Sequence, residues 1–199
     1  MKRLMAGRAA GIAVLVVVAA LAAVMLVMRS WSVHPDGSGL LASANRQMHE
    51  AMSVDPKGSG VGSWTFGMRL CLSGAGGPAV LRQVGPGETV GTGFRELGTG
   101  IRVFTPTPSH EPIISVSAYP PPAAQMPDAL AKVDGYAVTT PCSNTPRQEY
   151  TELLVGLGMA GDDGGGWKGV KISYEAGGHT FTVLIDHDLL ICGRSDPLC

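Results

Sequence analysis

The sequence has few charged and few aromatic residues for its length. Charged residues make up 16% of the 199 positions, and Phe, Trp and Tyr together make up 6%. Four of the 15 basic side chains flank an N-terminal apolar run, which leaves the rest of the chain with 11 basic and 16 acidic side chains, a net charge of −5. Such a surface lacks the basic stripe that binds a phosphate backbone, so we expect no nucleic-acid partner.

Short catalytic and metal-binding motifs are also missing. The chain contains no Gly-x-Ser-x-Gly, no His-Glu-x-x-His and no Ser-x-x-Lys sequence. No two cysteines show the Cys-x-x-Cys spacing of zinc knuckles and thioredoxin-like sites. The sequence therefore predicts no metal site, no cofactor and no familiar nucleophilic centre.

One long apolar run is present, at the N-terminus. Residues 9–28 contain no charged side chain and are nearly all Ala, Val, Leu, Ile or Met. About 20 such residues can cross the roughly 30 Å hydrocarbon layer as a helix. Basic residues are concentrated in residues 1–8, which places this tail in the cytoplasm and the rest of the chain outside. We expect a single-pass cell-membrane anchor, with a signal peptide cut after Ala22 as the alternative.

The sequence contains four cysteines, and all of them follow the apolar run: Cys71, Cys142, Cys192 and Cys199. An even number of cysteines in a small exported domain predicts two disulfides. Their spacing does not decide the pairing. A short terminal loop between Cys192 and Cys199 would leave Cys71 to pair with Cys142.

Residues 29–62 are predicted to link the anchor to the exported domain. Within them Leu40, Leu41, Ala44, Met48 and Met52 recur at helical spacing. We expect a short amphipathic helix here, which forms a stalk or a lid over the domain. The glycine-rich sequence PKGSGVGS after it is predicted to be a flexible joint.

Residues 63–199 show the alternation typical of β-strands. Short stretches rich in β-branched and aromatic residues are separated by glycine and proline. GVKISYE and HTFTVLI form the best-defined pair, with Gly177 and Gly178 as the turn between them. YPPPAAQMPDALAKV is predicted to be a rigid crossover between sheets. We expect one all-β extracytoplasmic domain, an antiparallel β-sandwich for which the immunoglobulin-like arrangement is one form.

The C-terminal sequence IDHDLLICGRSDPLC brings together the side chains that most resemble a catalytic set. Asp186 and Asp188 lie on one face of an extended strand, with His187 between them and Cys192 nearby. Adjacent acids at the end of a strand are typical of a solvated sheet edge, and an oxidised cysteine provides no thiolate. We interpret this segment as a strand edge and a disulfide.

The loop MAGDDGGGWKG supplies the candidate ligand contacts. Asp162 and Asp163 could help to bind calcium, but two carboxylates are too few for a self-contained site. Trp167 is expected either to be buried or to be exposed as an anchor for a ligand. The other glycine-rich stretch, GPGETVGTGFRELGTG, lacks the context of a phosphate loop and predicts bulges and turns.

These observations favour a non-catalytic module of the bacterial envelope that binds a protein or a glycan. Its alternative is an extracytoplasmic enzyme acting on envelope glycans or peptides, with Asp186, His187, Asp188 or Glu96 in its site. A structural or sensory subunit that associates through the membrane helix is a third class.

Overall fold

The computed structural model describes most of the chain after the predicted stalk, and of residues 52–54 it describes the backbone alone. The chain divides into two units, Met1–Val33 and His34–Cys199, and every described residue belongs to the second. The predicted anchor at 9–28 and Cys199 lie outside the described residues. No helix in the part that is described is long and apolar enough to span a membrane. The described residues are 40–43, 52–54, 62–74, 77–105, 112–126, 129–142 and 149–193.

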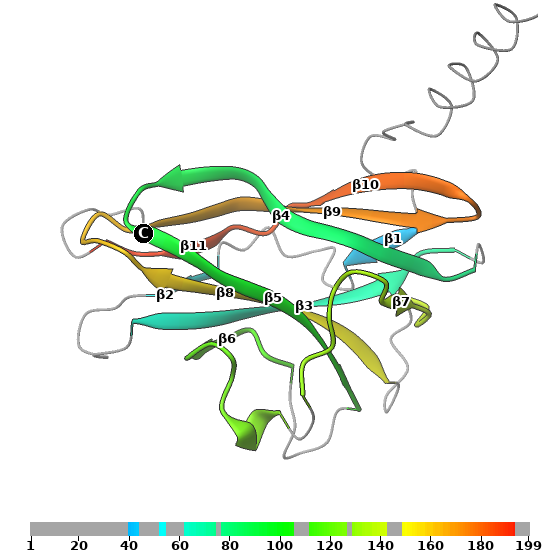
Figure 1. The fold of residues 1–199 in the computed structure, drawn as a ribbon, viewed down its shortest axis with the longest axis horizontal. Coiled ribbons are helices and arrows are strands. Elements are labelled where there is room, and N and C mark those ends of the chain that lie inside the picture. Colours follow the sequence, from blue (N-terminus) through cyan, green and yellow to red (C-terminus); the bar gives the residue numbers. More distant parts are fainter. Residues whose placement is uncertain are drawn as a thin grey trace, which may run out of the picture. The chain divides into compact units, whose positions relative to one another are not determined.

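The described residues form two sheets of mostly antiparallel strands, as Figure 1 shows. Sheet A has the order β1-β3-β8-β5, with β6 also paired to β3, and sheet B has the order β2-β11-β9-β4-β7, with β10 also paired to β9. The all-β prediction is confirmed. Sheet A consists of β1 (Leu41–Ser43), β3 (Ser63–Leu72), β5 (Phe94–Phe104), β6 (Ser115–Ser117) and β8 (Tyr150–Met159). Sheet B consists of β2 (Met52–Val54), β4 (Ala79–Gly91), β7 (Ala137–Val138), β9 (Gly165–Ala176), β10 (His179–Ile185) and β11 (Leu189–Ile191).

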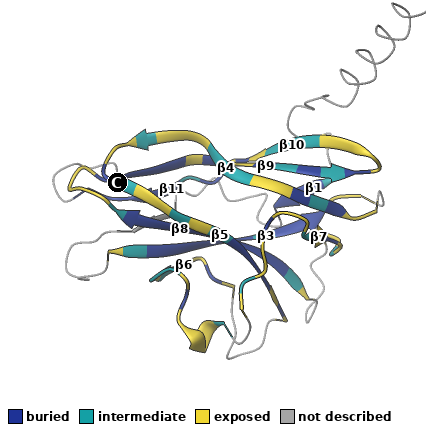
Figure 2. Cartoon of the chain, in the orientation of Figure 1, coloured by how far each residue is buried: buried dark blue, intermediate teal, exposed yellow. Residues whose placement is uncertain are grey.

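The two sheets share one hydrophobic core. Phe66 and Met68 of β3 belong to the same buried cluster as Ile172 and Tyr174 of β9. These residues occupy alternate positions because successive side chains of a strand point to opposite faces of the sheet. Buried residues are concentrated on β3, β8 and β9, whereas β4 and β5 carry long exposed stretches (Figure 2).

The hairpin predicted from GVKISYE and HTFTVLI is confirmed. β9 and β10 pair antiparallel with His179 opposite Ala176. Gly177 and Gly178 form the two-residue turn and have φ values of 56° and 78°. Positive φ at both positions is the type I′ geometry, which glycine adopts without steric cost.

The amphipathic helix predicted in the stalk is wrong at the positions that the structure describes. Leu41–Ser43 is β1, which pairs with Leu70, Cys71 and Leu72 of β3. Met52–Val54 is β2, which runs parallel to β11. All three residues of β1 are buried, so pairing and burial outweigh the local helical spacing. The residues between the two strands lie outside the described part.

Residues 112–142 include the predicted crossover and reach both sheets. Ala131 bridges Ile101 of β5, and β7 pairs with the start of β4. The helix η1 (Ala123–Gln125) is the one helical turn described in this stretch. Cys142 then forms a disulfide with Cys71 of β3, with a Cα–Cα distance of 4.8 Å.

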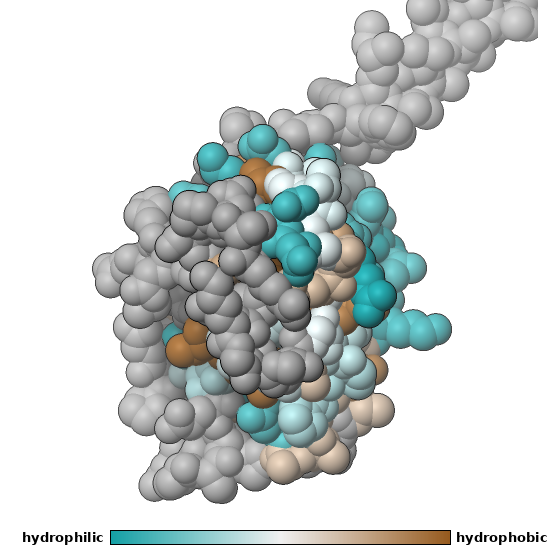
Figure 3. All heavy atoms as spheres, turned by 90° about the vertical axis from the view of Figure 1, so that its left-hand side faces the viewer, coloured by the Kyte–Doolittle hydropathy of each residue, from teal (hydrophilic) through white to brown (hydrophobic). Residues whose placement is uncertain are grey.

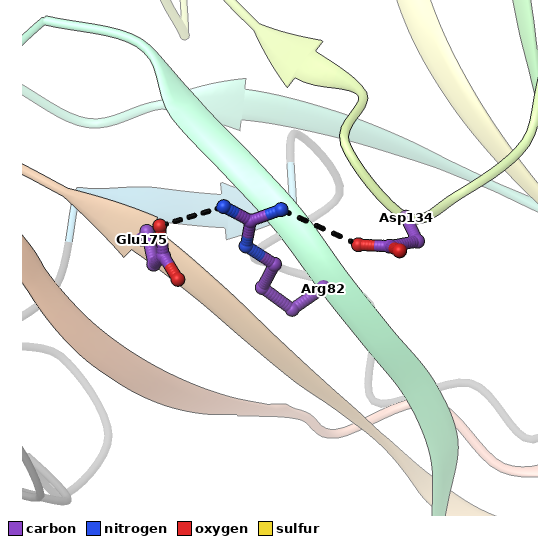
Figure 4. Close-up of polar contacts among 3 residues, drawn as sticks. All are labelled: Arg82, Asp134 and Glu175. Carbon is purple, nitrogen blue, oxygen red and sulfur yellow. Dashed lines mark hydrogen bonds and ion pairs between the residues drawn. The ribbon is translucent and has the colours of Figure 1, made fainter.

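Exposed ion pairs attach the end of this crossover to sheet B. Arg82 of β4 contacts Glu175 of β9 at 2.8 Å and Asp134, which directly follows the crossover, at 3.4 Å (Figure 4). The side chain of Asp134 is 76% exposed, and water screens charges of this kind strongly. The contacts therefore orient the turn and contribute little to stability.

Candidate functional site

The candidate site lies on the face of sheet A that points away from sheet B. Residues 112–126, which we name the strap, include β6 and η1 (Figure 1). β6 pairs with β3 within sheet A, and the strap residues on either side of β6 lie over this face. A Cβ atom on Gly67 would collide with the carbonyl of Ile113, and one on Gly156 would collide with the ring of Tyr119. A Cβ atom on Gly98 would lie 2.9 Å from the Tyr119 hydroxyl. Glycines in β3, β5 and β8 therefore allow the strap to lie directly on the sheet.

Sheet A holds the strap mainly through the backbone of the strap. The Gly67 amide donates to the carbonyl of Ile114 at 3.1 Å, and the Ala118 amide donates to the carbonyl of Ser63 at 2.9 Å. The Thr65 hydroxyl donates to the carbonyl of Ala118 at 2.5 Å. β6 adds a short antiparallel pairing with the start of β3.

A buried ion pair contacts both ends of the strap. Arg102 of β5 and Glu152 of β8 are 6% and 0% exposed, and Nη2 of the arginine lies 2.6 Å from Oε2 of the glutamate. The other carboxylate oxygen of Glu152 accepts the amide proton of Ile113 at 2.8 Å. Nη1 of Arg102 donates to the carbonyl of Gln125 at 2.6 Å. The carboxylate of Glu152 and the guanidinium of Arg102 thus bind an N–H group and a C=O group of the strap.

Aromatic rings and a second arginine surround this ion pair. The guanidinium of Arg102 lies 4.5 Å from the ring centre of Phe104. Phe104 lies 5.8 Å from Tyr150, and Arg69 of β3 lies 5.0 Å from the Tyr150 ring. The two arginine–ring contacts are of the cation–π type, which strengthens when water is excluded.

Burial dominates the electrostatics under the strap. It raises the pKa of Glu152 to about 7, although Arg102, the Ile113 amide and Arg69 each act to lower it. Burial also raises the pKa of Tyr119, which lies against Gly156. Burial therefore opposes ionisation of Glu152 and Tyr119, whereas the two arginines beside Glu152 favour its charged form.

The strap contains a strained residue at its best-anchored point. Ala118 has a φ of 116°, and it is the only non-glycine residue with positive φ among those described. A Cβ atom makes this region of φ unfavourable, by about 1–3 kcal/mol for a residue held there. Both backbone polar groups of Ala118 are bonded to β3, so the sheet maintains the strained geometry.

The loops singled out in the sequence converge elsewhere, at the end of the molecule shown in Figure 3. The Gly93 amide donates to the carbonyl of Gly164 at 2.8 Å, which joins the β4–β5 and β8–β9 turns. A Cβ atom on Gly193, after β11, would lie 2.7 Å from the carbonyl oxygen of Asp162. Asp162 and Asp163 are exposed on the β8–β9 turn. In the part of the chain that is described, no three His, Cys, Asp or Glu side chains are grouped so that they could hold a metal ion.

Trp167 lies in the core rather than on the surface. It is 2% exposed, and its indole N–H donates to Oε1 of Glu96 at 3.0 Å. Burial is thus the alternative that the structure shows for this residue. The carboxylate of Glu96 is correspondingly occupied by the indole of a core residue.

The C-terminal acids and histidine lie in different environments. Asp186 is exposed, whereas Asp188 accepts the amide proton of Gly169 at 3.0 Å. His187 is 5% exposed, and its Nδ1 atom has no hydrogen-bond partner in the described structure. Cys192 is buried and disulfide-bonded, while the predicted partner Cys199 lies outside the described residues. A cysteine in this state provides no nucleophile.

Sequence reasoning missed the ion pair and the strap. The available signal was a charge inside an otherwise apolar strand, at Arg102 in GIRVF and at Glu152 in YTELLVGL. Long charged side chains are almost never fully buried unless they are paired, so two such interruptions could have suggested a pair. No spacing indicated that the two strands are neighbours.

Comparisons with known proteins do not assign the chain to a family. No family model, curated protein or solved structure matches the chain. The functional interpretation therefore rests on the residues of the chain itself.

Proposed function

We propose that the chain is a single-pass membrane protein whose C-terminal domain is a non-catalytic interaction module outside the cytoplasm. The observation that carries the proposal is the disulfide between Cys71 and Cys142. Disulfides persist in secreted and envelope proteins and are rare where cellular thiols keep cysteines reduced. Cys192 is also disulfide-bonded, and no described cysteine is free.

The proposed anchor is the apolar run at residues 9–28, with residues 1–8 in the cytoplasm. Its support is the sequence alone. Protease added to intact spheroplasts should digest residues 34–199, whereas the same protease should leave a protein retained in the cytosol intact. Labelling with a thiol reagent after denaturation should find no free cysteine. Four reactive thiols in cytosolic protein would refute the proposal.

The domain architecture that we propose is a β-sandwich. The support is the single core shared by sheets A and B. The immunoglobulin-like form has less support, because its characteristic disulfide joins the two sheets. Here Cys142 lies beside Leu72 of the same strand that carries Cys71.

The structural roles of the candidate acids favour binding over catalysis. Among these acids, Glu96 bonds Trp167 and Asp188 bonds the Gly169 amide. Glu152, which the sequence did not single out, is paired with Arg102. The proposed partner is a protein or glycan of the envelope. Photo-crosslinkers placed on the domain in intact membranes should give position-dependent adducts, and their absence at every position would contradict the proposal. A hydrolase activity on envelope polymers that Asp186→Ala and Asp188→Ala abolish would establish the enzyme alternative instead.

A further inference from the structure

The outer face of sheet A recognises an extended backbone. Five hydrogen bonds to the strap go to its N–H or C=O groups, at Ile113, Ile114, Gln125 and both polar groups of Ala118. The strap also lies close to two glycines, with the backbone carbonyl of Ile113 over Gly67 and the ring of Tyr119 over Gly156. Binding of this kind depends on backbone hydrogen bonds, with side-chain pockets that select the sequence.

The strap is bonded to sheet A through its backbone but buries few of its own side chains. Of its 15 residues only Ile113 and Pro121 are buried, and Ile114 is 68% exposed. A segment with few buried apolar contacts belongs to the low-stability end of a fold and opens locally. The strain at Ala118 lowers the stability of the docked form further, because a released strap can leave the positive φ.

We propose that the strap is a replaceable occupant, and that the partner of the interaction module is a protein that adds an extended segment to β3 in place of β6. The inference rests on the proposed function and narrows its partner class from protein or glycan to protein. The incoming segment would bond to the backbone groups of Ser63, Thr65 and Gly67. It would place a backbone carbonyl over Gly67 and a ring over Gly156, and it would carry no charge where it covers Arg102 and Glu152.

Ala118 provides a matched pair of variants that changes the docked strap in opposite directions. Ala118→Gly removes the steric cost of the positive φ, and Ala118→Val increases it, while neither changes a backbone hydrogen bond. In the full-length chain in detergent, hydrogen exchange at the Gly67 and Ala118 amides should slow about fivefold in A118G and accelerate about tenfold in A118V. Exchange at the Leu81 amide, which bonds the carbonyl of Tyr136, should not change.

A synthetic peptide tests whether the occupant can be replaced. The probe is a fluorescent peptide with the sequence of residues 112–126 carrying A118G, and the control is a scrambled peptide of the same composition. Binding to the full-length chain should be tighter for A118V than for the wild type and weaker for A118G. The factors should match those seen in hydrogen exchange, because the strap and the peptide compete for one surface. Equal binding of the probe and the scrambled peptide would overturn the inference.

Crosslinking in membranes separates this inference from the proposed function. A photo-crosslinker at Val116 of β6 should capture a protein more strongly in A118V than in A118G. A crosslinker at Thr182, on the outer face of sheet B, serves as the control. Capture at Thr182 alone would refute the strap inference and leave the proposed function standing. Capture at no position would refute both.

Discussion

Arg102 and Glu152 face each other from neighbouring strands and form a buried ion pair. The two residues are directly opposite in the β5–β8 register, and Arg69 of β3 is opposite Glu152 on the other side. The carboxylate therefore lies between two arginines at the centre of sheet A. The strap excludes water from this position, so each charge depends on the others and on the strap.

Removing the arginine should destabilise the domain strongly. Arg102→Leu leaves Glu152 buried without its partner, which costs about 3–5 kcal/mol for a buried pair. Urea denaturation of the full-length chain measures this loss. Arg82→Leu, which breaks exposed contacts only, is the matched control and should leave the denaturation midpoint nearly unchanged. Equal effects of the two substitutions would mean that the Arg102 pair does not stabilise the fold.

Glu152 should make stability depend on pH. Its pKa is raised in the folded state to about 7 from 4.5, so the folded protein binds the proton more tightly than the unfolded chain does. Protonation of Glu152 therefore adds roughly 3 kcal/mol to the free energy of unfolding. This contribution is fully present below about pH 4.5 and is lost as the pH rises through about 7. Glu152→Gln cannot titrate. The free energy of unfolding of E152Q relative to the wild type should therefore increase between pH 4.5 and pH 8, and a constant difference would show that Glu152 remains ionised throughout.

The glycines under the strap should not tolerate a methyl group. Gly156→Ala places a Cβ atom against the Tyr119 ring and should force the strap away from β8. We expect faster hydrogen exchange at the Ile113 and Ala118 amides and a lower denaturation midpoint. Gly85→Ala is the control, because a Cβ atom there meets nothing within 4 Å. Unchanged exchange in G156A would show that the ring can move aside without opening the strap.

The disulfide between Cys71 and Cys142 should contribute substantially to stability. It closes a loop with a sequence separation of 71 residues, for which the loop-entropy relation gives about 4 kcal/mol. The double substitution to serine at Cys71 and Cys142 should lower the free energy of unfolding by about this amount. Denaturation of the double variant beside the wild type, both without reductant, measures it. A loss near zero would mean that the crossover alone holds this end of β3.

The strands were predictable because their signal is local. Alternating apolar residues in KISYE and TFTVLI, with two glycines between them, are sufficient to specify the β9–β10 hairpin. The helix predicted around Leu40 and Met52 is wrong for a non-local reason. Leu41 is paired with Leu72 and is 2% exposed. The sequence around Leu41 does not predict this pairing with β3.

The site was less predictable than the fold. Asp162 and Asp163 are adjacent acids, which are easily recognised in a sequence. Arg102 and Glu152 are 50 residues apart, and they are neighbours only because β5 and β8 are adjacent in sheet A. The glycines at 67, 98 and 156 are equally uninformative alone. Their role is evident only in the fold, where the strap, which is distant from them in the sequence, lies over them.

The position of the disulfide determines the fate of the molecule when a protease cuts the strap. Residues 112–126 lie between Cys71 and Cys142 in the sequence, inside the loop that the S–S bond closes. A single nick there would leave both fragments in one covalent molecule, with the new chain ends free to leave β3. Such a molecule would run as a single band until reductant is added.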